Sequence, residues 1–227
     1  MKNQTQDVRI TNYSIIDWKI TPSKKDPTMT KQQQFLHAAN TGDLATFLQI
    51  LNDNSIDPNH ADEYGNTALT GAAEHGQSNI VRALLTDQRF DPNLSDKDGY
   101  TALLLASIKG HDKVVSALLA DMRTDPNLAD KKGWTALMHA TKNGHTEAVI
   151  ALLANTRTNP NIIDNQKCTV LLHAINLGFV TILKKLLACK RTDPNIADNV
   201  KETALMWAAK KGHTEAITSL LTDTRTN

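Results

Sequence analysis

Aromatic residues are scarce in this chain of 227 residues, where they make up 4% of the sequence against 40% for all hydrophobic residues. A core of this composition is filled mainly by small aliphatic side chains. Cysteine is equally rare: Cys168 and Cys189 are too few for a disulfide framework and fit a reducing compartment. No apolar run approaches the ~18 residues of a membrane-spanning helix. The N-terminal stretch MKNQTQDVRITNYSIIDWKI also lacks the apolar centre of a secretory signal, so we expect a cytoplasmic protein unless export uses a route without a cleaved signal.

An excess of charge of one sign is also missing. The chain carries 25 basic and 24 acidic side chains, which give a formal net charge of +1. Proteins that bind nucleic acids or anionic membranes normally carry a clear basic excess. We therefore expect neither as a partner, although a local basic stripe stays compatible with this balance.

The sequence does contain a period of 34 residues. The triplet TAL begins at Thr67, Thr101, Thr135 and Thr203, and TVL begins at Thr169. The pair PN begins at Pro58, Pro92, Pro126, Pro160 and Pro194. A glycine follows each triplet, at Gly76, Gly110, Gly144, Gly178 and Gly212. The register extends back to Gly42 through FLHAANTGDLATFLQIL, so six units predict a solenoid in which each unit buries its apolar face against its neighbours.

The composition of one unit distinguishes between two helical repeats of about this length. In TALMHATKNGHTEAVIALL, the spacing of Leu137, Ala140, Thr141 and Gly144 is that of one helix face made of small groups. Gly144 is expected to end this helix, and a second helix follows over EAVIALL. The stretch ANTRTNPNIIDNQKC then forms a long turn-rich link. Tetratricopeptide repeats have short links and a Trp-Leu-Gly-Tyr pattern that is absent here, so the unit is a helical hairpin with a projecting turn.

The stretches DEYGNTALTGAA, DKDGYTALLLAS and DKKGWTALMHAT resemble the signature Asp-x-x-Gly-x-Thr-Pro-Leu-His-x-Ala-Ala of the ankyrin repeat. The resemblance covers about residues 31–227 and implies an all-α ankyrin-repeat solenoid of about six helix-turn-helix units with projecting β-turn loops. The expected units, repeats one to six, are 31–64, 65–98, 99–132, 133–166, 167–200 and 201–227. Residues 1–30 are expected to form an N-terminal extension, either a cap in which Ile15, Ile16 and Trp18 fold back on the first repeat, or a flexible segment that docks elsewhere.

Two departures from this signature bear on stability. The signature His is replaced by Thr70, Leu104, Met138, Leu172 and Met206, where we expect apolar packing to replace its hydrogen bonds. The turn glycine is kept as Gly65, Gly99 and Gly133 but becomes Lys167 and Lys201. A residue other than glycine in a left-handed turn costs about 1 kcal/mol. We therefore expect altered or looser turns in repeats five and six.

Histidine and cysteine side chains invite a metal or catalytic interpretation. His139 and His173 occupy the same slot of adjacent repeats, but zinc needs further ligands about 2 Å from the ion. The other occupants of this slot are His37, Gly71, Leu105 and Trp207. Cys168 has no base or orienting carboxylate fixed by the spacing. His111, His145 and His213 each follow a helix-ending glycine and are interpreted as turn residues that lead into the second helix.

We therefore expect no catalytic residue, no metal or other cofactor and no small-molecule substrate. An enzyme whose activity lies in residues 1–30 is the remaining alternative, and so short a segment cannot build an active site.

A column of arginines also follows the period, at Arg89, Arg123, Arg157, Arg191 and Arg225. Each follows a second helix, where free carbonyls and the helix dipole favour a cation. Two residues after the arginines, a mostly acidic column recurs at Asp91, Asp125, Asn159 and Asp193. We interpret the arginines as helix caps and inter-repeat pairs; a stripe that binds an anionic or acidic partner is the alternative.

A second line on the first helix, through positions 136, 139 and 143, lies about 100° from the packed face. This line varies from Ala-Gly-His to Ala-Trp-Lys between repeats, whereas the packed line stays Leu-Ala-Gly. We expect the variable line to be exposed. The resemblance implies that it forms, together with the turn tips, the concave face with which ankyrin repeats bind partners.

The implied function is non-catalytic protein–protein recognition by a monomer through this concave groove. The predicted partner-binding residues are Tyr64, Asn66, Lys97, Tyr100, Leu105, Lys131, Lys132, Trp134, His139, His173 and Trp207. Tyr100, Trp134 and Trp207 are the predicted anchors, because large aromatic side chains dominate binding hot spots; inter-repeat packing is the alternative role. The Asn-, Gln- and Thr-rich style and the TDPN loops also resemble ankyrin-repeat proteins of intracellular gamma-proteobacteria, so the alternative function is that of an effector delivered into a host cell to bind a host protein.

Overall fold

A computed structural model of the chain describes residues 29–53 and 55–227. The chain divides into two units, Met1–Thr30 and Lys31–Asn227. The predicted N-terminal extension, with Ile15, Ile16 and Trp18, lies outside the described residues apart from positions 29 and 30. The helices of the described residues are α1 (Lys31–Thr41), α2 (Leu44–Leu51), α3 (Ala68–Glu74), α4 (Ser78–Thr86), α5 (Ala102–Lys109), α6 (Asp112–Ala120), α7 (Ala136–Lys142), α8 (Thr146–Ala154), α9 (Val170–Asn176), α10 (Val180–Ala188), α11 (Ala204–Lys211) and α12 (Thr214–Leu221).

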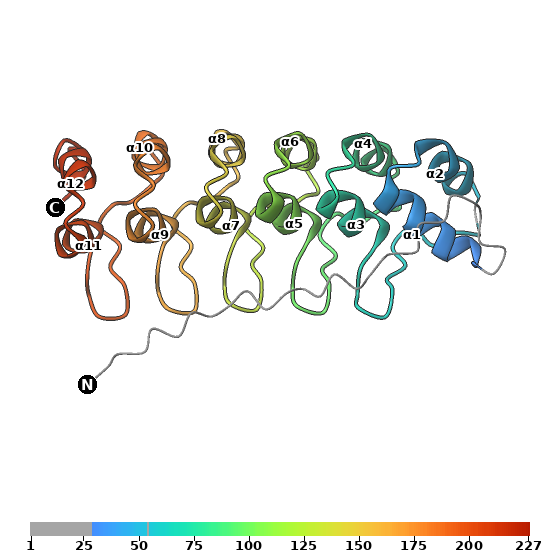
Figure 1. The fold of residues 1–227 in the computed structure, drawn as a ribbon, viewed down its shortest axis with the longest axis horizontal. Helices are drawn as coiled ribbons and strands as arrows, with labels where there is room; N and C mark the ends of the chain where they lie inside the picture. Colours follow the sequence, from blue (N-terminus) through green and yellow to red (C-terminus); the bar gives the residue numbers. More distant parts are fainter. Residues whose placement is uncertain (1–28, 54) are drawn as a thin grey trace. The chain divides into compact units, whose positions relative to one another are not determined.

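The helices pair in chain order, and the pairs stand side by side in a row. Figure 1 shows the odd-numbered helices in one layer and the even-numbered helices in a second layer. The links between pairs project from the row on the side of the odd-numbered helices. Three links close with an isolated antiparallel bridge, at Ser95–Thr101, Ala129–Thr135 and Ile163–Thr169. The predicted all-α solenoid of helix pairs with projecting turns is therefore confirmed.

The threonine of each TAL or TVL triplet marks where an odd-numbered helix begins. Thr135 Oγ1 accepts a hydrogen bond from the backbone N–H of Met138 at 3.4 Å, which satisfies one of the free donors of α7. The same cap is present at Thr67, Thr101 and Thr169. Thr203 precedes α11 without a side-chain cap bond. After α7, Gly144 adopts φ 72°, a left-handed conformation in which glycine avoids the steric cost of a side chain.

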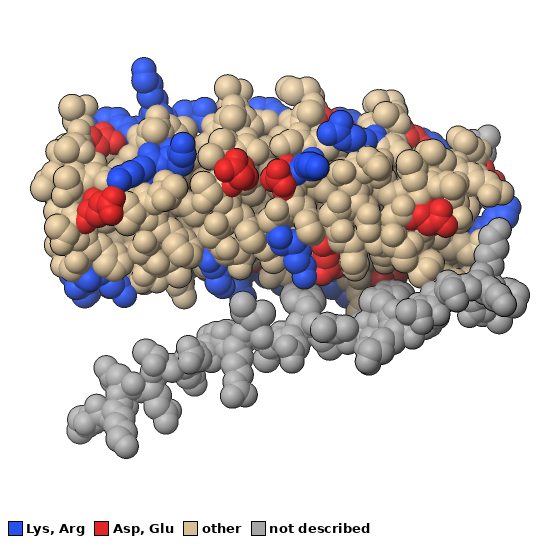
Figure 2. Space-filling model, turned by 45° about the horizontal axis from the view of Figure 1, so that its top comes forward, with Lys and Arg blue, Asp and Glu red and all other residues tan. Residues whose placement is uncertain are grey.

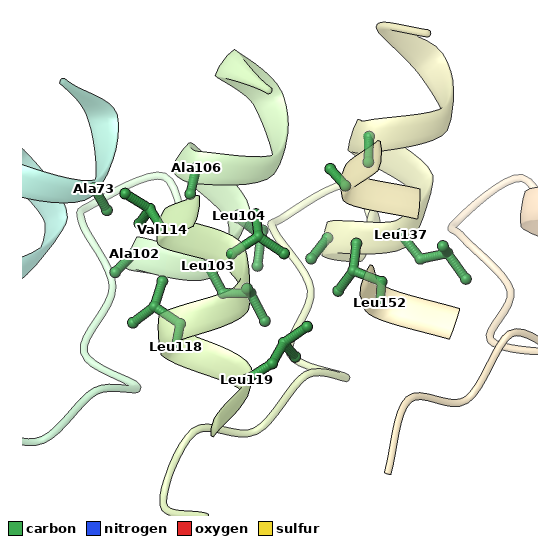
Figure 3. Packing of buried hydrophobic residues seen from close by; sticks show 14 of the residues in the cluster. Ala73, Ala102, Leu103, Leu104, Ala106, Val114, Leu118, Leu119, Leu137 and Leu152 are labelled. Atoms are coloured by element: carbon green, nitrogen blue, oxygen red, sulfur yellow. The ribbon is translucent and has the colours of Figure 1, made fainter. Parts of the chain in front are cut away.

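The core lies between the two helix layers and is continuous from pair to pair. Figure 3 shows Leu103 and Leu118 pointing toward each other between α5 and α6, and Leu137 and Leu152 in the next pair. Each of these leucines is buried, and full burial of such a side chain contributes about 1.5–3 kcal/mol. The packed line of the first helices is thus buried as expected, and Met138, at a signature His position, is buried among apolar neighbours.

The arginine column joins each repeat to the one before it. The guanidinium group of Arg157 donates to the carbonyl oxygens of Leu119 at 2.9 Å and Met122 at 3.1 Å, at and just after the end of α6. The same kind of bond is made by Arg89, Arg123, Arg191 and Arg225. The interpretation as caps and inter-repeat pairs is therefore confirmed, and these donors are engaged within the solenoid.

The acidic column after the arginines takes part in contacts between loops through its backbone. Arg123 pairs with Asp121, two residues before it, at 2.6 Å. The backbone N–H of Asp125, two residues after it, donates to Oδ1 of Asn93 at 2.8 Å. Asn93 belongs to the PN pair of the preceding loop, and its Nδ2 donates to the carbonyl oxygen of Arg123 at 2.8 Å. The PN asparagines therefore fasten each loop to the next, a role that their regular spacing did not reveal.

Two of the histidines that follow a helix-ending glycine add a third inter-repeat contact. His111 Nε2 lies 3.0 Å from the carbonyl oxygen of Glu74, and His145 Nε2 lies 3.0 Å from that of Ile108. Both histidines immediately precede an even-numbered helix. Their predicted place in the turn before the second helix is confirmed, and their rings also hold the preceding first helix.

Candidate partner-binding surface

Each projecting turn is organised around one aspartate. In the Asp130 turn, the backbone N–H of Asp130 donates to the carbonyl oxygen of Trp134 at 3.0 Å, and that of Gly133 donates to Asp130 O at 2.9 Å. The carboxylate Oδ1 of Asp130 accepts from the backbone N–H groups of Lys132 at 2.8 Å and Trp134 at 2.9 Å. The same backbone pattern recurs at Asp62, Asp96, Asp164 and Asp198. The turn thereby fixes the main chain of the residue before each Thr.

A side chain from the following helix completes three of these turns. His139 Nε2 lies 3.0 Å from Oδ2 of Asp130, and His173 Nε2 lies 2.9 Å from Oδ2 of Asp164. Trp207 donates Nε1–H to Oδ2 of Asp198 at 3.0 Å. The variable slot of the first helix therefore supplies a hydrogen-bond partner for the turn, which the sequence pattern did not show.

In two of these turns the occupant of this slot helps to lower the pKa of the turn aspartate. Burial raises the pKa of Asp96 above its ordinary value, and the charge of Asp98 acts in the same direction, although three backbone N–H groups act against them. Burial acts in the same direction on Asp130, but hydrogen bonds from His139 and from two backbone N–H groups outweigh it, so the pKa of Asp130 is lowered. The slot beside Asp96 holds Leu105, which has no donor. The contrast follows from the hydrogen bond that His139 gives to the Asp130 carboxylate and from the like charge of Asp98 beside Asp96.

Trp134 packs against a histidine of its own repeat and against a histidine of the following repeat. Its ring centroid is 5.4 Å from that of His139 and 4.4 Å from that of His173, with tilted planes. The Lys142 ammonium lies 4.7 Å from the Trp134 ring centroid, a cation–π arrangement. Tyr100 approaches His139 from the preceding turn, with ring centroids 5.7 Å apart. The indole is therefore held by inter-repeat packing, yet it stays partly exposed.

The predicted partner-binding residues divide by exposure. Tyr64 is 46% exposed, and Lys97, Lys131 and Lys132 are exposed at the turn tips. The partly buried group comprises Asn66, Tyr100, Trp134, His173 and Trp207. Leu105 and His139 are buried, with exposed fractions of 9% and 8%. We name as the tip surface the set Tyr64, Lys97, Tyr100, Lys131, Lys132, Trp134, Lys142, Lys167, His173 and Trp207. Contact of these residues with a partner stays a prediction.

The expectation that positions 136, 139 and 143 form one exposed line is wrong at its first two positions. Ala136 is fully buried, as are its equivalents in α3 and α5. His139 is drawn beneath its own turn by the hydrogen bond to Asp130. Asn143, one turn further along, is exposed. The side of the helix that faces the surface therefore runs through the last turn of α7, where Lys142 lies.

Adjacent turns are joined by backbone hydrogen bonds except at one junction. Asn165 N–H donates to the carbonyl oxygen of Lys132 at 3.0 Å. Equivalent bonds run from Lys97 to Tyr64 and from Lys131 to Asp98. Between the Asp164 and Asp198 turns, both within the described residues, this bond is absent.

The missing bond coincides with a lysine in a left-handed conformation. Lys167 has φ 64°, and Lys201, in the last turn, has φ 65°. A Cβ built on Gly133, the equivalent of Lys167, would lie 3.0 Å from the backbone nitrogen of Asn165 in the next turn. The Cβ of Lys167 therefore keeps the following turn at a distance. Both lysines are thus left-handed, but the hydrogen bonds within their turns match those of the glycine turns, so the difference lies in the missing bond between turns.

The His, Cys and Asp side chains of these turns bear on metal binding and on nucleophilic chemistry. Within residues 29–53 and 55–227, no group of three or more His, Cys, Asp and Glu side chains is placed to hold a metal ion. Burial, together with the Asp164 and Asp198 carboxylates, raises the pKa of the Cys168 thiol to about 11. This thiol therefore stays protonated at neutral pH, which makes it a poor nucleophile. In the part of the chain that is described, no helix has the length and apolar character to cross a bilayer.

Known structures resemble this chain over most of its length. An ankyrin repeat protein named EF0377 is 28% identical, with a TM-score of 0.77, over 86% of this chain and 99% of that one. An ankyrin repeat domain from Acinetobacter baumannii AYE is 30% identical, with a TM-score of 0.75, over 82% and 95% of the two chains. A chain in the complex of the predatory endopeptidase Bd0816 from Bdellovibrio bacteriovorus with the immunity protein Bd3460 is 26% identical, with a TM-score of 0.70, over 82% and 96%.

Sequence comparison gives the family directly. No curated protein matches the sequence significantly. The family profile described as ankyrin repeats (three copies) matches residues 35–130, 122–198 and 174–227. These matches together span the helix pairs from α1 to α12. The chain belongs to the ankyrin repeat family.

Proposed function

We propose that the chain is a non-catalytic recognition module that binds a partner protein through the tip surface, with Tyr100, Trp134 and Trp207 as anchors. Proteins of the ankyrin repeat family generally act as interaction modules, and one matched structure is a complex of two proteins. The finer proposal concerns the surface used and the residues that make the contact.

The observation that carries the proposal is the way the aromatic side chains are fixed. Trp134 packs between His139 and His173, and Trp207 donates to the buried carboxylate of Asp198. Each indole nevertheless stays partly exposed. A rigid, partly exposed aromatic side chain loses little conformational entropy on binding and offers a large contact area, the properties of binding hot spots.

The test compares proteins that co-purify with the native chain and with a variant that carries Tyr100→Ala, Trp134→Ala and Trp207→Ala. A matched variant carries Leu48→Ala, Met122→Ala and Leu221→Ala, which removes three exposed large side chains outside the tip surface. We expect all three proteins to fold by circular dichroism. A specific partner should be lost only from the tip-surface variant. Equal recovery of that partner by both variants would refute the proposed surface.

A further inference from the structure

The exposed charges on the Asp130 turn, on α7 and on the Asp164 turn are all positive, although this part of the sequence contains acidic residues. From residue 130 to residue 179 the acidic side chains are Asp130, Glu147 and Asp164. Asp130 and Asp164 are buried, with exposed fractions of 6% and 3%. Glu147 lies in the first turn of α8, in the other helix layer. Neither turn therefore presents a carboxylate to the surface.

The two buried carboxylates are also engaged. Oδ1 of Asp164 accepts from two backbone N–H groups at 2.8 and 2.9 Å, and Oδ2 lies 2.9 Å from His173 Nε2. Burial lowers the pKa of His173, against the effect of Asp164, so at neutral pH this histidine is the neutral donor to Asp164. The carboxylates are thus committed to the turns and are unavailable as partners for surface lysines.

Four exposed lysines lie on the Trp134 turn, on the helix that follows it and on the next turn. Lys131 and Lys132 occupy the tip of the Asp130 turn, and Lys142 lies over the Trp134 ring. Lys167 occupies the next turn, which is bonded to the first by Asn165 N–H to Lys132 O at 3.0 Å. Lys131 has an ion pair with Asp98 at 3.7 Å, but both side chains are more than half exposed, and such pairs contribute little.

Lys167 adds an independent observation. It occupies a left-handed position that glycine holds in three equivalent turns, and its presence coincides with the loss of a turn-to-turn hydrogen bond. Strained backbone conformations of this kind gather at functional sites. Here the strain places a cation on the turn that adjoins Trp134.

We propose that the four lysines bind an acidic segment of the partner protein, with carboxylates on the ammonium groups and an apolar side chain against Trp134. The inference rests on the proposed function and adds the chemistry of the partner. A strand of nucleic acid fits less well, because acidic Asp62, Glu63 and Asp98 lie on the two preceding turns. On the side of the even-numbered helices, which Figure 2 brings forward, basic and acidic side chains are interspersed without a continuous basic band.

The experiment selects binders from a library of random dodecapeptides displayed on phage, using the full chain as target. Counter-targets are Trp134→Ala and a quadruple variant with Lys131, Lys132, Lys142 and Lys167 changed to Gln. A matched quadruple variant changes Lys113, Lys184, Lys185 and Lys190 to Gln, which removes the same charge from α6, from α10 and from the second residue after α10. Circular dichroism confirms the fold of each target. Affinities of synthetic selected peptides are measured by fluorescence anisotropy, with oligothymidylate of equal length as the phosphate probe.

We expect the selected peptides to be enriched in Asp and Glu around one apolar residue. Their affinity should fall at least tenfold in the tip-surface quadruple variant and less than threefold in the matched variant. Peptides that need Trp134 but show no acidic enrichment would overturn this inference and leave the proposed function standing. Absence of any peptide that needs Trp134 would count against both. If oligothymidylate binds more tightly than the peptides and loses this binding in the tip-surface quadruple variant, the proposed acidic segment is wrong and the ligand is a nucleic acid.

Discussion

Replacement of Lys167 by glycine is expected to stabilise the junction between repeats five and six. Lys167 has φ 64°, whereas the equivalent positions in three turns hold glycine. A left-handed conformation costs a residue with a side chain roughly 1–2 kcal/mol. Glycine also lowers the stability by about 0.4–1 kcal/mol, because it gives the unfolded chain more conformational freedom. The net gain from relief of strain is therefore about 1 kcal/mol.

The smaller residue also allows the Asp164 and Asp198 turns to approach. At the preceding junction, Asn165 N–H donates to Lys132 O at 3.0 Å. The corresponding donor and acceptor at the next junction are Asn199 N–H and Gln166 O. A restored hydrogen bond contributes about 1 kcal/mol. The total of about 2 kcal/mol corresponds to a rise in Tm of roughly 4–8 °C for a chain of this size.

The assay is thermal unfolding followed by circular dichroism, combined with hydrogen exchange of the amides in α11 and α12. Because repeats are stabilised mainly by their neighbours, exchange should slow in these helices more than in α3 and α4. Gly133→Lys is the reverse control, since its Cβ would lie 3.0 Å from Asn165 N, and it should lower the Tm. An unchanged or lower Tm for Lys167→Gly, or a raised Tm for Gly133→Lys, would refute the reasoning.

Three further substitutions test individual bonds by urea unfolding. Thr135→Ala removes a helix cap and should cost about 1 kcal/mol, whereas Thr203→Ala, at a position without a side-chain cap bond, should cost clearly less; equal costs would contradict the cap assignment. Arg157→Ala removes bonds to carbonyls of the preceding repeat and should cost about 2 kcal/mol, so a cost near zero would show that the clamp is not stabilising. His139→Leu should raise the pKa of Asp130. Because its pKa is lowered in the folded protein, the ionised Asp130 carboxylate stabilises the fold at pH values above its ordinary pKa of 3.8. This stabilisation is lost as the pH falls through the lowered pKa of the folded protein. The cost of His139→Leu should therefore shrink between pH 6 and pH 3, and a cost that does not change over this range would contradict the pKa assignment.

The sequence predicted the architecture because the repeat encodes it in short-range signals. The Thr before each first helix, the glycine after it and the apolar spacing between them recur in register, and the same local physics acts in every copy. The arginine column was also interpretable, because a cation after a helix has few structural roles. Even the left-handed lysines followed from the register, since glycine holds the equivalent positions.

What the sequence did not predict depends on contacts across the turns. Burial of His139 follows from its bond to Asp130, nine residues earlier, which helical periodicity cannot show. The pairing of Arg123 with Asp121 and the fastening role of Asn93 involve loop geometry that the 34-residue register leaves open. The positive surface around Trp134 was hidden for a related reason. A net charge counts Asp130 and Asp164 against the lysines, whereas burial removes these carboxylates from the surface.

Site-specific crosslinking tests the central claim, recognition through the tip surface, most directly. A photoreactive benzoyl-phenylalanine would replace Lys132, beside Trp134 on the tip surface, and in a second protein Met122, which is 76% exposed outside it. After irradiation with the co-purified partner, we predict a covalent adduct from position 132 and none from position 122. An adduct from position 122 with none from position 132 would contradict the account.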